Sequence, residues 1–139
     1  MRNALAFILG LVLGGVVNMS LIVLGPSLIP PPSGVDVTNA QSLAASIHLF
    51  EPRHFLFPFM AHALGTLTGA LVAFLIAASN RSVLAYAVGA LSLAGGIAAA
   101  FMIPAPMWFI TVDLVGAYIP MAWLGILLGR RFKGAAARA

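Results

Sequence analysis

Cysteine is absent from the 139 residues of this chain, and acidic residues are scarce, with three Asp and Glu against seven Lys and Arg. Without cysteine there is no disulfide framework, no thiol nucleophile and no thiolate metal site. The sequence also lacks a nucleophile elbow, a phosphate-binding glycine loop and an H-E-x-x-H motif. These absences, together with the lack of a soluble catalytic domain, argue against an enzyme.

Charged residues make up only 7% of the chain, and hydrophobic residues make up 62%. Soluble domains have about 45–50% apolar and about 25% charged residues. A chain this small could not hide so much apolar surface from water, so its solvent is expected to be lipid. The formal net charge is +4. The few basic residues stand near the ends of apolar runs, which indicates membrane orientation, so we expect the bilayer as a partner and no nucleic acid.

Apolar runs long enough to cross a membrane occur four times, since about 20 helical residues span a hydrocarbon core of about 30 Å. They cover approximately residues 3–29, 54–79, 82–103 and 107–129. Lipid offers no hydrogen-bond partners to the backbone, so each run should be helical. The first run is longer than the apolar region of a signal peptide and has no A-x-A-like cleavage site, which favours a retained span. The predicted fold is an all-α integral membrane protein, an antiparallel bundle of four transmembrane helices in a single domain over residues 1–139.

The basic residues are concentrated on one side of the predicted four-span topology. With four spans, one side carries Arg2, Arg81, Arg130, Arg131, Lys133 and Arg138, and the other carries only Arg53. Basic residues concentrate on the cytoplasmic side of membrane proteins. The pattern predicts a multi-pass protein of the inner membrane with cytoplasmic N- and C-termini.

The one sizeable loop, residues 30–53, is then outside, and it begins with a run of prolines. Within it Leu43, Ile47 and Phe50 recur at helical spacing, after Thr38 or Asn39 as a cap. We therefore expect a short amphipathic helix near residues 39–50. It would lie on the outer surface or fold over the mouth of the bundle.

Polar side chains interrupt the apolar runs on the same faces as the small residues, and this set is predicted to form an intramembrane polar core. Its members are Asn18, His62, Thr66, Asp113 and Tyr118. With a rise of about 1.5 Å per residue, Asp113 lies about 9 Å, His62 about 12 Å and Asn18 about 16 Å below the outer ends of their spans. His62 and Asp113 could therefore pair. Such a pair is typical of a proton relay or a solute contact, and a polar lock that fixes helix register is the alternative.

Two further groups of residues are candidate sites. His48, Glu51 and His54 follow one another at intervals of three, and Glu-x-x-His spacing recurs in carboxylate-bridged metal sites. The alternative is that Glu51 and Arg53 cap and anchor the second span. The second group could bind anionic lipid head groups, or serve simply as a topology signal; it comprises Arg130, Arg131 and Lys133.

Three stretches carry a resemblance that extends over most of the chain: "IPPPSGVD", "LFEPRHFLFPFMAHALGT" and "DLVGAYIPMAWLG". They resemble segments of a family of small bacterial inner-membrane proteins with four spans and uncharacterised function. The resemblance implies a four-span fold of the inner membrane. It implies no activity and assigns no functional residue.

Three functions remain open at this point. The first is a small membrane protein that acts in an assembly, as a homo-oligomer or as an accessory subunit of a larger complex, because small residues abound and no extramembrane domain exists. The second is a small transporter or channel-like protein that uses His62 and Asp113. The third is an intramembrane metal protein or enzyme that uses Glu51 and His54. No cofactor is predicted, and a metal ion belongs only to the third alternative.

Overall fold

The structure is a computed structural model that describes residues 1–136, and all regular secondary structure in this range is helical. Four helical segments of this range are long and apolar enough to cross a membrane, which confirms the four predicted segments and indicates a multi-pass membrane protein. The helices are α1 (Arg2–Leu28), α2 (Ala40–Ser46), α3 (Leu56–Ile76), α4 (Arg81–Met102), α5 (Met107–Gly116) and α6 (Ile119–Ala136), with short 3-10 turns η1 (Ile47–Leu49) and η2 (Pro52–Phe55).

The start of the chain determines where α3 ends. The side-chain oxygen of Asn3 accepts hydrogen bonds from the N–H groups of Ala78 and Ser79, and Arg2 Nε donates to the carbonyl of Ile76 at 2.7 Å. These contacts satisfy backbone groups beyond the last helical turn, where no partner within the helix is available. The helix therefore ends at Ile76, earlier than the predicted limit at Ser79.

The fourth predicted span, over residues 107–129, is long and apolar enough to cross a membrane, but its helix is interrupted. α5 ends at Gly116, α6 begins at Ile119, and Ala117 and Tyr118 form the bend between them. Pro120 has no N–H, and in a continuous helix its ring would collide with the carbonyl of Gly116. Pro26, by contrast, lies inside α1 without ending it.

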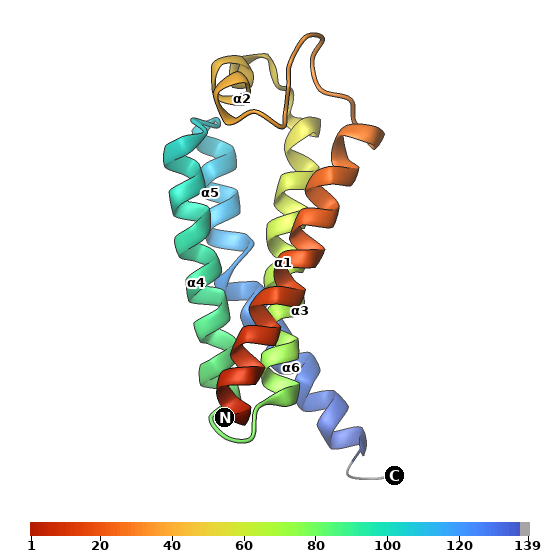
Figure 1. The fold of residues 1–139 in the computed structure, drawn as a ribbon, viewed down its shortest axis with the longest axis vertical. Helices are drawn as coiled ribbons and strands as arrows, with labels where there is room; N and C mark the ends of the chain where they lie inside the picture. Colours follow the sequence, from red (N-terminus) through yellow and green to blue (C-terminus); the bar gives the residue numbers. More distant parts are fainter. Residues whose placement is uncertain (137–139) are drawn as a thin grey trace.

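Packing centres on α3, which contacts α1, α4 and α6, whereas α1 touches α4 only sparsely. Figure 1 shows α1 and α3 side by side along most of their length. Four glycines make this approach close: a Cβ at Gly14 would lie 2.6 Å from the carbonyl oxygen of Gly65, and one at Gly10 would lie 2.6 Å from that of Gly69. We call these four residues the glycine seam. Small residues that let backbones meet are a main source of helix association in lipid.

The two ends of the bundle differ. The N-terminus and the end of α6 lie at one end, the terminal end, and α2 lies across the other, the loop end (Figure 1). Asn39 caps α2, because its side-chain oxygen accepts hydrogen bonds from the N–H groups of Gln41 and Ser42. Just before it, hydrogen bonds from the hydroxyl and the N–H of Thr38 hold the pKa of Asp36 below its usual value. Of the two predicted placements, α2 takes the one over the mouth of the bundle.

Candidate polar site in the bundle

The predicted partners His62 and Asp113 are in direct contact. His62 Nδ1 lies 2.9 Å from both carboxylate oxygens of Asp113. In the tautomer with the proton on Nδ1, the ring donates to the carboxylate and leaves Nε2 for another partner. Asp113 is 4% exposed, whereas the His62 side chain is 23% exposed. The Asp113 carboxylate is thus buried, whereas the His62 imidazole is partly exposed.

Tyr118 completes the site from the bend between α5 and α6. Its hydroxyl donates a hydrogen bond to Asp113 Oδ2 at 3.0 Å, and its ring stacks on His62 with centroids 5.7 Å apart. Gly96 on α4 provides the room, because a Cβ there would collide with the Tyr118 hydroxyl. The helix break and the missing side chain at Gly96 together place the phenol beside the carboxylate.

These contacts satisfy the buried carboxylate. Within the described range, no buried side-chain nitrogen or oxygen lacks a hydrogen-bond partner. Removing one partner of a buried ion pair costs about 3–5 kcal/mol, since the other charge is left uncompensated. The triad of His62, Asp113 and Tyr118 therefore depends on all of its members.

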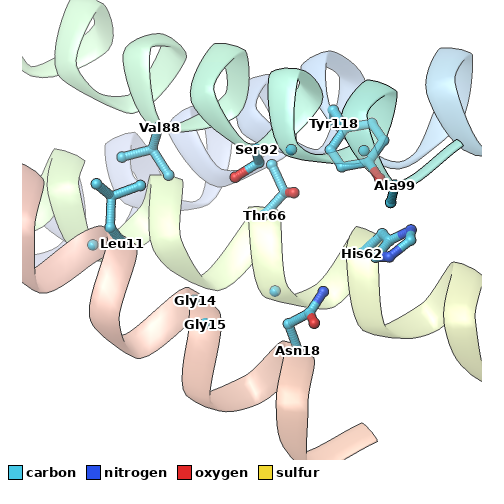
Figure 2. A pocket seen from close by; sticks show the side chains of 14 residues that line it. Leu11, Gly14, Gly15, Asn18, His62, Thr66, Val88, Ser92, Ala99 and Tyr118 are labelled. Carbon is cyan, nitrogen blue, oxygen red and sulfur yellow. The ribbon is translucent and has the colours of Figure 1, made fainter. Parts of the chain in front are cut away.

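Beside the triad lies a partly open cavity of about 310 Å³, the central cavity, lined by residues of α1, α3 and α4 and by Tyr118. Figure 2 shows Asn18 on α1, Thr66 on α3 and Ser92 on α4 around this space, with His62 and Tyr118 at one end of it. No side-chain hydrogen bond between residues of the described chain occupies Asn18, Thr66 or Ser92. Their polar groups are therefore available to a molecule in the cavity.

The predicted polar core thus divides into two parts. His62, Asp113 and Tyr118 form one hydrogen-bonded group, whereas Asn18 and Thr66 line the cavity next to it. Ser92 and Gly96 are small residues of the third span, and the sequence assigned no site role to either of them. Their spacing of four on one helix face was the available signal, because it places a hydroxyl and a gap on the same side of α4.

The candidate metal ligands do not converge in the structure. His54 accepts the N–H of Glu51 at Nδ1 and lies 3.1 Å from the carbonyl of Pro30 at Nε2, and Glu51 pairs with Arg53 at 2.9 Å. His48 is exposed. No group of three metal-ligating side chains forms among residues 1–136. The contacts resemble those of a helix cap, and metal binding there stays a prediction.

Basic residues gather at the terminal end, where Arg130 and Arg131 are exposed and Lys133 is half-buried near the end of α6. Arg2 and Arg81 begin α1 and α4 at the same end. Arg138 lies outside the described residues. Binding of anionic lipid head groups at Arg130, Arg131 and Lys133 stays a prediction.

No family model matches the chain, and no curated protein or solved structure matches it. The resemblance to small four-span bacterial proteins is therefore still a prediction. Any role for the triad depends on its geometry and its chemistry.

Proposed function

We propose that this chain is a small inner-membrane transporter or channel-like protein in which His62 and Asp113 exchange protons with a small solute in the central cavity. The four spans would run antiparallel, with both termini in the cytoplasm. The distribution of Lys and Arg supports this orientation, because Arg53 is the only basic residue of the opposite side. The cap that Asn3 forms on the residues after α3 supports antiparallel α1 and α3.

The observation that carries the proposal is a buried carboxylate at a helix break, facing a polar cavity through one histidine. Ionisable side chains inside membrane spans mark ion or solute pathways more often than lipid-facing surfaces. Discontinuous helices commonly form the sites of transporters, because unwound backbone can line a cavity there. Asp113 precedes such a break and Tyr118 lies in it.

The cavity itself distinguishes this function from a polar lock. A lock that only fixes register needs a pair satisfied on all sides and no space beside it. Here His62 Nε2 has no hydrogen-bond partner within residues 1–136, and the ring borders the central cavity. A solute or water molecule there could give a proton to Nε2 or take one from it. Asp113 would meanwhile hold the ring orientation through Nδ1.

The lining restricts the solute. Neither Lys nor Arg contributes to the central cavity, and its polar groups are an amide, hydroxyls and the imidazole. An anion would find no fixed cation to replace its hydration. Protons and small neutral or cationic solutes fit this chemistry best.

Proton flux in proteoliposomes tests the proposal. Vesicles loaded with a pH-sensitive dye, driven by a potassium–valinomycin potential, should acidify faster with the protein than without it. His62→Ala and Asp113→Asn should abolish this flux, measured on the fraction of each variant that is folded and monodisperse in detergent. Ala98→Leu is the matched control, since Ala98 is exposed and does not line the central cavity. Wild-type protein that gives no flux above empty vesicles, or variants that retain full flux, would overturn the proposal.

Assembly is a second candidate, favoured by one observation. Gly15 on α1 and Gly95 on α4 both border the central cavity, are exposed, and have nothing within 4 Å of an added Cβ. A helix from a second copy or from another subunit could cover this side. The mass of the intact particle in mild detergent tests this idea. A homo-oligomer or a particle with a foreign subunit supports assembly, and a monomer contradicts it.

A further inference from the structure

A second space lies beneath α2, and we call it the roofed chamber. Its volume is about 290 Å³, close to the lower end, about 300 Å³, of small-molecule sites. Leu43 and Ile47 belong to its lining, together with Phe50 just after η1. His62 lines both this chamber and the central cavity. The two spaces therefore adjoin at the imidazole.

The walls of the roofed chamber are almost entirely apolar. Ile22 of α1, Ile103 just after α4, and Phe109 and Ile110 of α5 belong to the lining, among other apolar residues. The only ionisable groups in the wall are His54, His62 and Asp113. His54 uses both ring nitrogens, one for the N–H of Glu51 and one for the carbonyl of Pro30. Polar recognition is thus confined to the place where His62 meets Asp113.

The charges of this wall exclude charged ligands. Asp113 is already bonded by His62 and Tyr118, and neither Lys nor Arg lines the chamber. An anion would face the carboxylate without an offsetting cation, and a cation would exchange its hydration for apolar walls. A ligand of this chamber is therefore uncharged, with a body that buries apolar surface.

We propose that the roofed chamber binds a neutral amphiphile drawn from the membrane, with one hydroxyl head that donates to His62 Nε2 and an aliphatic or aromatic body. The head hydrogen-bonds the imidazole of His62, and the body lies beneath Leu43 and Ile47. This binding does not rest on the proton exchange proposed above, because it needs only a hydrogen bond at the ring. It does place a ligand next to the central cavity.

Photolabelling with an octanol that carries a diazirine on its chain tests the proposal. The full-length protein is reconstituted in phosphatidylcholine vesicles, labelled by light, and mapped by mass spectrometry of its peptides. Adducts should appear at lining residues such as Ile47, Phe50 and Ile103, should saturate, and should decline with excess octanol. Adducts that increase linearly with probe and spread over lipid-facing positions would overturn the proposal.

Two substitutions on α4 sharpen the experiment. Ala100 lines the roofed chamber, so Ala100→Leu should fill part of it and lower the apparent affinity by about tenfold, which corresponds to about 1.4 kcal/mol. Ala98 is exposed, so Ala98→Leu is the matched control and should leave labelling unchanged. If Ala100→Leu does not fold, Leu43→Ala opens the roof and should weaken labelling instead. If a folded Ala100→Leu or Leu43→Ala protein is labelled as strongly as the Ala98→Leu control, the proposed binding site is wrong.

Proton flux measured in the same vesicles separates the two proposals. Saturable labelling without flux supports the amphiphile site and removes the proposed proton function. Flux without saturable labelling supports the proposed proton function and removes the amphiphile site.

Discussion

The two faces of α1 carry adjacent glycines with opposite surroundings. A Cβ on Gly14 would lie 2.6 Å from the backbone oxygen of Gly65, whereas a Cβ on Gly15 would have no neighbour within 4 Å. Both glycines border the central cavity, but only the first belongs to the seam that joins α1 to α3, whereas the second lies at the open edge between α1 and α4. Glycines of α1 thus form a closely packed interface with α3 and leave the space between α1 and α4 open.

This difference shows what a stripe of small residues does and does not determine. Glycine permits close approach, but the backbone must then be brought in by other contacts. Along the seam, the bonds of Arg2 and Asn3 to the end of α3 and the following turn fix α1 against α3. α4 makes no comparable bond to α1 in the described range, and polar groups face the space between them.

The largest loss of stability is expected when a side chain is introduced into the glycine seam. Gly14→Leu places its Cβ against the backbone of α3, which cannot move without separating the helices. Overpacking costs about 1–3 kcal/mol or more where the neighbour is backbone. Thermal unfolding in detergent should show a large loss of stability or failure to accumulate. Gly15→Leu should remain close to wild type, and equal losses in the two variants would break the comparison.

A smaller effect is expected at Gly96, where the neighbour is the end of a side chain. Gly96→Ala pushes the Tyr118 hydroxyl away from Asp113, which removes one hydrogen bond to a charged group. Such a bond contributes about 1.5–3 kcal/mol. We expect a moderate decrease in the unfolding temperature. Because Tyr118→Phe removes the same bond, the double variant should be no less stable than Gly96→Ala alone; additive losses would contradict this explanation.

The smallest effect on stability is expected at the open edge of the cavity. Gly95→Leu adds a side chain where none lies within 4 Å, and leucine has a helix propensity about 1 kcal/mol better than glycine. The unfolding temperature should remain unchanged or increase slightly. The added side chain should nevertheless narrow the central cavity and reduce proton flux. Reduced stability together with unchanged flux would show that this edge is a packing surface.

The helices were predictable from the sequence because lipid permits little else for long apolar runs. The proximity of His62 and Asp113 could also be anticipated, since both interrupt such runs at similar depth. The break at Ala117 and Tyr118 was not predicted, although Pro120 stands within the fourth apolar run. Pro26 and Pro120 look alike in sequence, and only tertiary surroundings decide that one helix continues and the other ends.

The cavities could not be predicted, because they depend on distances between helices. The sequence around Ser92 does not distinguish a serine that lines a cavity from one buried between two close helices. Ser92 lines the central cavity because α1 and α4 make only sparse contact. The role of Gly96 likewise depends on Tyr118, a residue distant in sequence. Local periodicity identifies which face of a helix points inward, and it says nothing of what lies opposite.

Accessibility of the central cavity to water is the central claim, and the absence of cysteine makes it directly measurable. A single cysteine at Ser92 should react with a small water-soluble thiol reagent, because the reacting thiolate forms only where water is present. Single cysteines at Ala70, which is fully buried, and at Ala98, on the exposed face of α4, are the controls. The account predicts that in vesicles Ser92→Cys reacts much faster than either control. A Ser92→Cys protein that reacts no faster than Ala70→Cys would contradict the account.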